Sequence, residues 1–142
     1  MKVLIKRVDN SLPLPQYKTE GAAGFDLICR ESAAVGPREI VRIPVNIIVK
    51  TPPGYMLMLI ARSSTAMKKG LILINGAGII DSDYCGAEDE IRVQVYNFTD
   101  KEVHVTRGDR IAQGIFVKIA RGEWEEVNKV DKDSRGGFGS TG

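Results

Sequence analysis

The sequence has little cysteine, histidine or net charge. The two cysteines, Cys29 and Cys85, are too few and too far apart for a disulfide framework or a paired-cysteine metal site, so we expect free thiols in a reducing compartment. The single histidine, His104, lies in a Glu-Val-His-Val strand pattern, and we expect it at the surface. A net charge of +2 does not favour a nucleic-acid or membrane partner, although a local cluster of cations could still bind a small polyanion.

Long apolar runs and a leader segment are also missing. No run approaches the roughly 20 apolar residues that cross a bilayer. The charged residues among positions 1–9 predict a strand rather than a signal peptide. We therefore expect a cytoplasmic protein. With 43% hydrophobic and 27% charged residues, the 142-residue chain has the composition of a globular domain with its own core.

Apolar residues follow the alternation of β-strands along most of the chain. Pro44 within one β-branched run suggests an edge strand or a bulge there. Turn-forming sequences such as Pro-Pro-Gly at 52–54 and Arg-Gly-Asp at 107–109 separate the runs. Many short strands with regular turns predict an all-β sandwich or barrel. The expected strands cover residues 3–8, 40–49, 55–60, 91–96, 102–105 and 111–119.

One short helix is expected over residues 65–69, ended by Gly70. Ser63 or Ser64 could cap its first turn. Because Arg62 precedes them, a cation, two hydroxyls and the backbone N–H groups of a helix start come together, and such a set suits a phosphate. The alternative is simple capping by serine, with Arg62 as a surface cation.

The Asn-Gly pair at 75–76 predicts a hairpin turn. An apolar pair then leads to Asp81 at the end of a strand, with Tyr84 close behind it. A carboxylate in that place could orient and deprotonate a water molecule. A tyrosine ring could stack on a sugar or a base. The alternative is an acidic turn followed by a packed tyrosine.

Other polar residues stand in apolar settings. Asp26 lies inside a strand pattern, either as an orienting group near a cation or as a turn former. Asp109 and Arg110 are candidates for an ion pair. Gln113 either bonds to the backbone or contacts a ligand, because buried polar groups need partners. We expect Trp124 to be a packed aromatic near the end of the fold.

The last eight residues are half glycine, and such a segment cannot fold by itself. They include Arg135 for a phosphate, Phe138 for a flat base, and glycines that allow close backbone approach. These are the components of a lid, and the alternative is a disordered end. We place the folded domain at residues 1–130 and the lid at residues 131–142.

Five segments of the chain resemble, in order, the five motifs of the trimeric deoxyuridine triphosphatase (dUTPase) family. The resemblance spans residues 22–142. Because all five motifs occur in the order of the family, it favours the lid over a disordered end. It implies a distorted jelly-roll or β-clip barrel with one short helix, in a homotrimer whose three active sites are shared. It also implies hydrolysis of dUTP to dUMP and pyrophosphate with Mg²⁺ as cofactor. The segments are residues 23–27, 62–64, 78–86, 108–113 and 136–142.

The resemblance also implies roles for single residues. Asp81 would activate the water that attacks the α-phosphorus, and Asp26 would reach Mg²⁺ through water. Tyr84 would pack under the deoxyribose and exclude a 2′-hydroxyl. The remaining implied substrate-binding residues are Arg62, Ser63, Ser64 and Gln113 for phosphates, Asn75, Gly78, Ile79, Ile80 and Phe138 for uracil, and Arg92, Arg135 and Gly139.

The chain departs from the family pattern at three places. Arg135 directly precedes Gly-Gly-Phe, whereas the family has a glycine and a variable residue between, so either Arg135 or Lys132 would contact the γ-phosphate. Residues 87–89 resemble an insertion that shifts the place of Arg92. Ser64 stands where the family often has glycine. The resulting Arg-Ser-Ser sequence also occurs in the related dCTP deaminases.

Two rival functions follow from the same pattern. A dCTP deaminase, or a bifunctional enzyme, would need a glutamate at the position of Gln94, and glutamine cannot shuttle a proton. Tyr84 also suits the hydrolase better. A nucleotide-sensing protein without turnover is the other rival, and the presence of both Asp81 and the tail argues against it.

Overall fold

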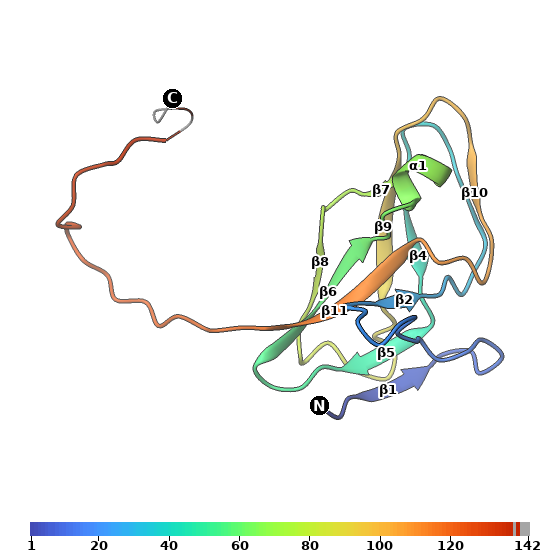
Figure 1. Ribbon diagram of the computed structural model, residues 1–142, viewed down its shortest axis with the longest axis horizontal. Helices are drawn as coiled ribbons and strands as arrows, with labels where there is room; N and C mark the ends of the chain where they lie inside the picture. The colour runs from blue at the N-terminus through green and yellow to red at the C-terminus, as the bar shows by residue number, and fades with distance from the viewer. Residues whose placement is uncertain (138, 140–142) are drawn as a thin grey trace.

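β-Strands dominate the part of the chain that the structure, a computed structural model, describes: residues 1–137 and 139 (Figure 1). The expectation of a mostly β chain with one short helix is confirmed. The strands are β1 (Leu4–Arg7), β2 (Phe25–Leu27), β3 (Ala33–Val35), β4 (Ile40–Pro44), β5 (Ile47–Lys50), β6 (Tyr55–Ala61), β7 (Leu71–Leu73), β8 (Gly78–Ile80), β9 (Arg92–Asn97), β10 (Val103–Val105) and β11 (Ala112–Lys118), and the helix is α1 (Thr65–Lys69).

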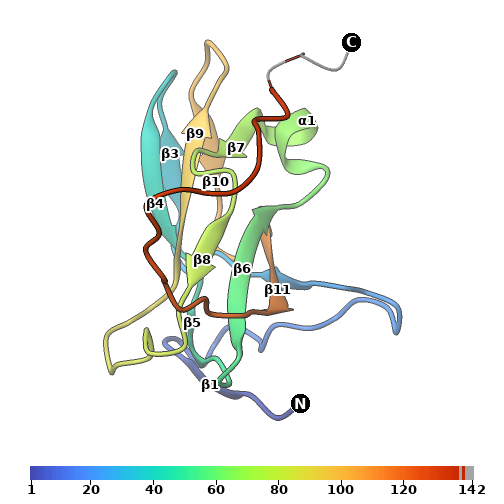
Figure 2. The same ribbon diagram turned by 90° about the vertical axis from the view of Figure 1, so that its left-hand side faces the viewer.

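All the strand pairs are antiparallel and form small sheets. One sheet has the order β2-β11-β6-β8 and another the order β4-β9-β7, while β1 pairs with β5 and β3 with β10. Figure 2 shows β6 and β8 side by side. This arrangement is a distorted jelly roll. No helix among the described residues has the length and apolarity needed to cross a membrane.

The core lies between the facing sides of these sheets. Along β9, Val93 and Val95 are buried while Arg92 and Gln94 are exposed, which confirms the predicted period of two. Burying each such aliphatic side chain contributes about 1.5–3 kcal/mol. Other fully buried side chains in the core are Leu27, Ile43, Leu57, Leu59 and Leu71.

The expected continuous strand over residues 40–49 is wrong, because the chain changes sheets within it. β4 pairs with β9, whereas β5 pairs with β1. Between them Asn46 has a φ of 67°, a left-handed conformation that asparagine tolerates better than β-branched residues. Its side-chain oxygen accepts the backbone N–H of Asp9 at 2.7 Å. The predicted irregularity at Pro44 therefore marks the end of a strand.

The predicted hairpin at the Asn-Gly pair is also wrong in its pairing. The turn itself forms, with Gly76 at a φ of 68° and its N–H donating to the carbonyl of Leu73 at 3.0 Å. The flanking strands belong to different sheets, however, since β7 pairs with β9 and β8 pairs with β6. The turn thus leads from one sheet to the other and leaves β8 beside β6.

The chain leaves the sheets after β11. Every residue from Lys118 to Gly137 is exposed, and Figure 1 shows this segment running away from the body. Trp124 is 99% exposed, so the expectation of a packed aromatic is wrong. That expectation assumed a surface of the same chain for the ring to pack on. The tail boundary predicted at residue 131 falls within this extended segment.

Candidate active site

Asp81 lies where the sequence predicts it, directly after the end of β8. The antiparallel register pairs Ile80 with Leu57 and Gly78 with Leu59. The residue after Ile80 therefore lies near the start of β6. Asp81 is exposed and lines a hollow of about 610 Å³ together with Tyr55, Asp83 and Arg121 among others. A hollow of this volume can hold a small molecule.

Asp81 and Tyr84 share one tight turn. The N–H of Tyr84 donates to the carbonyl of Asp81 at 3.2 Å, and Cys85 donates to the carbonyl of Asp83 at 2.9 Å. The carboxylate of Asp89, in the segment of residues 87–89 that resembles an insertion, accepts the next backbone N–H, that of Gly86, at 2.6 Å. Tyr84 is 42% exposed, which disfavours a packed ring and leaves part of it available to a ligand.

Of the residues expected to bind uracil, the four that the structure describes lie on or beside an edge strand. β8 pairs only with β6 in the described part of the chain, so its outer backbone groups are available for hydrogen bonds. Asn75 and Ile79 are exposed, and Gly78 and Ile80 are half-buried. Backbone donors and acceptors in a fixed row could recognise the edge of a base.

A second cluster gathers around Asp26 on β2. The Asp26 carboxylate forms an ion pair with Nε of Arg62 at 2.9 Å and accepts a hydrogen bond from a terminal nitrogen of Arg110 at 3.3 Å. Only 10% of its side chain is exposed. Of the two alternatives for Asp26, the orienting group near a cation is therefore the right one. The arginines are held in place while much of their charge still faces solvent.

Arg110 is a member of this cluster that the sequence interpretation missed. The expected partner of Arg110 was Asp109, but Asp109 instead pairs with Lys69, their atoms 2.6 Å apart. Adjacent residues of an extended chain point to opposite sides and cannot easily pair with each other. Nothing in the sequence alone indicated that Asp26, far away along the chain, takes the place of Asp109.

The serines before α1 are not used for capping. Ser64 occupies the cap position without a side-chain capping bond, and Ser63 is exposed. Gly70 ends the helix as predicted, in a left-handed conformation with a φ of 65°. The capping alternative therefore loses support, and the Ser64 hydroxyl lines a hollow of about 260 Å³ beside Arg62.

Gln113 faces Asp26 across the β11–β2 pairing. Its side-chain amide donates a long hydrogen bond of 3.5 Å to the carbonyl of Ala61. A bond of this length is weak, so it gives little support to the alternative that Gln113 only bonds to the backbone. A Cβ on Gly24 would come within 2.9 Å of the Gln113 side-chain oxygen. The glycine at the start of the first motif thus makes room for this amide.

The two clusters are well separated within one chain. Asp81 lies beside Met56 at the start of β6, and both line the same hollow. Arg62 lies six positions beyond Met56, roughly 20 Å along an extended strand. The described hollow that contains Asp81 contains neither Arg62 nor Asp26.

The other predicted residues stay apart from both clusters. Arg92 is exposed at the start of β9, opposite Pro44. Arg135 and Lys132 are exposed in the extended segment, and Gly139 is exposed as well. Phe138 lies outside the described residues. Among the described residues of the tail, 131–137 and 139, none lines the hollow beside Asp81.

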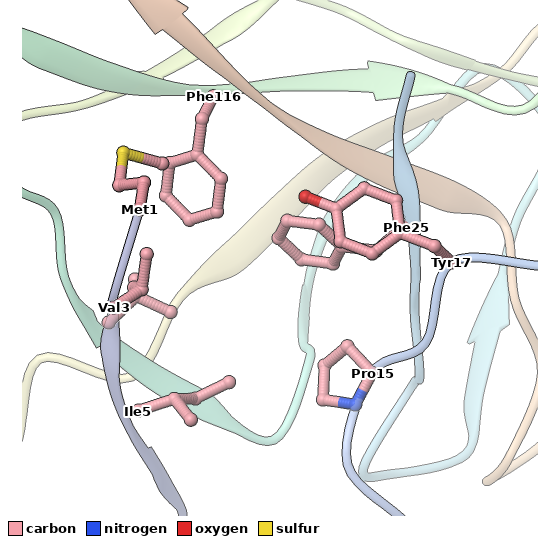
Figure 3. Close-up of a pocket in the computed structure, with 8 residues that line it drawn as sticks. Met1, Val3, Ile5, Pro15, Tyr17, Phe25 and Phe116 are labelled. Atoms are coloured by element: carbon pink, nitrogen blue, oxygen red, sulfur yellow. The ribbon is translucent and has the colours of Figure 1, made fainter. Parts of the chain in front are cut away.

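An apolar hollow of about 260 Å³ near the N-terminus is a poor candidate for the site. Figure 3 shows Met1, Val3 and Ile5 facing aromatic rings across it. Tyr17 and Phe25 form an edge-to-face pair, with ring centroids 5.6 Å apart. Its lining side chains carry neither a carboxylate nor a cation, so it offers nothing to a polyanion.

Cys29 is not a candidate nucleophile, and the described residues form no built metal site. Burial raises the pKa of the Cys29 thiol to about 12, and the nearby charge of Asp109 adds to the shift, so this thiol stays neutral. Both cysteines are free, as predicted. Within residues 1–137 and 139, His, Cys, Asp and Glu side chains form no group of three that could hold a metal.

Comparisons with known proteins agree on one family. A family model described as dUTPase matches residues 10–142. A deoxyuridine 5'-triphosphate nucleotidohydrolase of Hydrogenobaculum sp. (strain Y04AAS1) is 41% identical over 145 residues, covering 100% of this chain and 99% of the relative. The crystal structure of the Streptococcus mutans dUTPase has a TM-score of 0.78 and 32% identity, covering 84% of this chain and 98% of that one. A Staphylococcus bacteriophage 80alpha dUTPase with dUPNHPP shares the fold, with a TM-score of 0.86 and 24% identity over 99% of this chain and 98% of that one.

Proposed function

The chain belongs to the dUTPase family and hydrolyses dUTP to dUMP and pyrophosphate, and we propose that Asp81 is the general base of this reaction. One observation carries the proposal. Asp81 is an exposed carboxylate, fixed at the end of an edge strand beside a hollow and within one turn of Tyr84. The cytoplasmic nucleotide pool is where such an enzyme would meet its substrate.

The reaction needs one proton transfer and one displacement. Asp81 accepts a proton from water as the water oxygen attacks the α-phosphorus of dUTP. The bond from that phosphorus to the bridging oxygen breaks, and pyrophosphate leaves with the electron pair. A carboxylate is a weak base, so positioning and neutralisation of charge supply most of the acceleration.

The cluster around Asp26 suits the triphosphate. Arg62 and Arg110 are oriented by the Asp26 carboxylate, and both line the same hollow as Ser64. Preorganised cations cost little reorganisation when the charge of the transition state develops. Ser63, Ser64 and Gln113 would add neutral hydrogen bonds to the phosphate oxygens, and Arg92 a further cation.

The base and sugar fit the other cluster. The free edge of β8, with Asn75, would bind the uracil edge, and the exposed part of the Tyr84 ring would pack under deoxyribose. Phe138, Gly139 and Arg135 of the lid would cover the bound nucleotide. Lys132 remains the alternative to Arg135 for the γ-phosphate.

Mg²⁺ is the cofactor that we propose, held mainly by the triphosphate. Mg²⁺ needs only one or two protein carboxylates when phosphates and waters complete its shell, and this suits a chain whose described residues form no three-ligand cluster. Each oxygen of Asp26 contacts one arginine, but each keeps a further lone pair for a metal-bound water. When bound, Mg²⁺ neutralises phosphate charge.

We propose that the active site is shared in a homotrimer. Arg62 lies roughly 20 Å along the strand from Met56, which shares a hollow with Asp81. Within one chain that is too far for Asp81 and Arg62 to act on one phosphate group. Symmetric copies of the chain can bring the Asp81 of one subunit to the Arg62 of another. The tail, which leaves its own body, would cover a site on a neighbour.

Mixing two inactive variants tests this arrangement. Asp81→Asn and Arg62→Ala chains, each inactive alone, should regain about a quarter of wild-type activity when refolded together in equal amounts, because random assembly joins an intact Asp81 to another chain's Arg62 in that share of sites. Pyrophosphate release measures the gain, and light scattering should give the mass of three chains. If the mixture stayed inactive although mixed trimers had formed, both residues would belong to one chain's site.

A substrate panel tests the reaction itself. The purified protein with Mg²⁺ should release pyrophosphate from dUTP and little from dCTP, dTTP or UTP, because the β8 edge and Tyr84 read the base and the sugar. EDTA should lower the rate by about 100-fold or more, as expected when the charge-neutralising metal is removed. Equal turnover of dCTP, or release of ammonia, would favour the deaminase instead.

A further inference from the structure

Helix α1 has too few contacts of its own to be stable. It is five residues long, its cap residue makes no capping bond, and Thr65 is the single residue of the helix that is buried. Isolated helices of this length do not persist in water, because one turn of hydrogen bonds does not offset the cost of nucleation. The helix must therefore be held by other parts of the chain.

The side chains of Thr65 and Lys69 attach α1 to the segment of residues 104–111. At its start, the Thr65 hydroxyl donates to the carbonyl of Ile111 at 2.7 Å. At its end, the ammonium of Lys69 donates to the carboxylate of Asp109 at 2.6 Å and, more weakly, to the carbonyl of His104 at 3.4 Å. Both ends of the helix are therefore bonded to the same segment of the chain.

That segment is itself well fixed. The Asp109 carboxylate also accepts the N–H of Thr106 at 3.0 Å, while the backbone N–H of Gly108 donates to the carbonyl of Cys29 at 2.8 Å. Burial acts to raise the pKa of Asp109, but the bonds from Lys69 and Thr106 outweigh it and lower that pKa. Asp109 is thus an anion at neutral pH and a firm anchor for Lys69.

We propose that Lys69 is a positioning residue for the triphosphate, acting through its ion pair with Asp109. The pair fixes α1, and so the preceding Arg62 and Ser64, relative to Arg110, which directly follows Asp109. The inference rests on the proposed function, in which these groups bind phosphates. The Lys69 and Asp109 side chains are 32% and 30% exposed, so the pair contributes little to stability and its effect should appear in the chemistry.

The test removes the ammonium and keeps the bulk of the side chain. Lys69→Met should lower kcat/KM for dUTP by about tenfold, as small displacements of binding groups do. Affinity for dUPNHPP should fall by about threefold to fivefold, the scale of a partly exposed ion pair, while affinity for deoxyuridine, which has no phosphate, should not change. Lys69→Arg, which can still pair with Asp109, should restore most of the loss.

Lys68 provides the matched control. It is the preceding residue of the same helix, is exposed, and forms no ion pair within the described part of the chain. Lys68 lines the same hollow as Lys69, Arg62 and Ser64. Lys68→Met therefore removes the same charge from the same place without breaking an ion pair. It should lower kcat/KM by no more than about twofold, the scale of an unpaired, exposed charge. The comparison separates the loss of the pair from the loss of positive charge near the phosphates.

A double-mutant cycle decides whether Asp109 is the partner. In an Asp109→Asn background, Lys69→Met should have no further effect, because the interaction is already lost. Equal effects of Lys69→Met and Lys68→Met, or an undiminished effect in the Asp109→Asn background, would overturn the inference. Should the wild type fail to hydrolyse dUTP, the proposed function falls, and the affinities for dUPNHPP still decide whether the pair positions the phosphate-binding groups.

Discussion

Asp81→Asn is expected to lower kcat for dUTP by about 10³-fold, the usual contribution of a general base, and to leave dUPNHPP binding almost unchanged. The amide has nearly the shape of the carboxylate but cannot take the proton of the attacking water. Asp81 is exposed at the end of β8, so the substitution should not disturb the core. Steady-state rates of pyrophosphate release and calorimetric titration with dUPNHPP measure the two effects.

Asp83→Asn is the matched control for this variant. Asp83 is an exposed carboxylate in the same turn and lines the same hollow, so its loss removes the same charge. We expect Asp83→Asn to keep kcat within about tenfold of wild type, because electrostatic effects at exposed sites are small. An active Asp81→Asn enzyme, or equal losses in both variants, would show that Asp81 is not the base.

A chain that ends at Ser134 is expected to lose about 99% of its turnover, the scale of removing one charge-stabilising group and a closing lid. The deletion removes Arg135 and the glycine-rich end with Phe138. The removed residues that the structure describes, 135–137 and 139, are exposed, so the shortened chain should still assemble and bind dUPNHPP. Pyrophosphate release, dUPNHPP titration and light scattering on the shortened protein check these three statements.

Two point variants refine the deletion. Arg135→Ala and Lys132→Ala distinguish the two candidate cations for the γ-phosphate, since only the one that contacts it should raise KM for dUTP. Both side chains are exposed, so neither substitution should affect folding. Full activity of the shortened chain would show that the last eight residues are not a lid, and the alternative of a disordered end would hold.

Much of the local structure could be predicted from the residues alone. The alternation along β9, the helix ended by Gly70 and the place of Asp81 after β8 all depend on neighbours in the sequence. Side-chain periodicity and turn chemistry act over a few residues, so a linear pattern records them well. Five short motifs in order were enough to indicate the family.

Partners distant in sequence could not be predicted in the same way. Asp26 lies 84 positions from Arg110, and Lys69 lies 40 positions from Asp109, yet each pair is in contact. Any carboxylate can pair with any cation that the fold brings near, so the residue types alone leave the choice open. The adjacent Asp109 and Arg110 suggested a pair, but the fold gives each of them a different partner.

The sequence by itself determined where most of the strands lie, though not β3, and it determined the place of the helix and the carboxylate that ends a strand. Only the tertiary structure decided that the chain changes sheets at Asn46 and Gly76, and that Arg62 and Arg110 converge on Asp26 far from Asp81. The physical reason is that backbone pairing is nearly indifferent to side-chain identity. Register and partner strand are therefore set by the packing of the whole core.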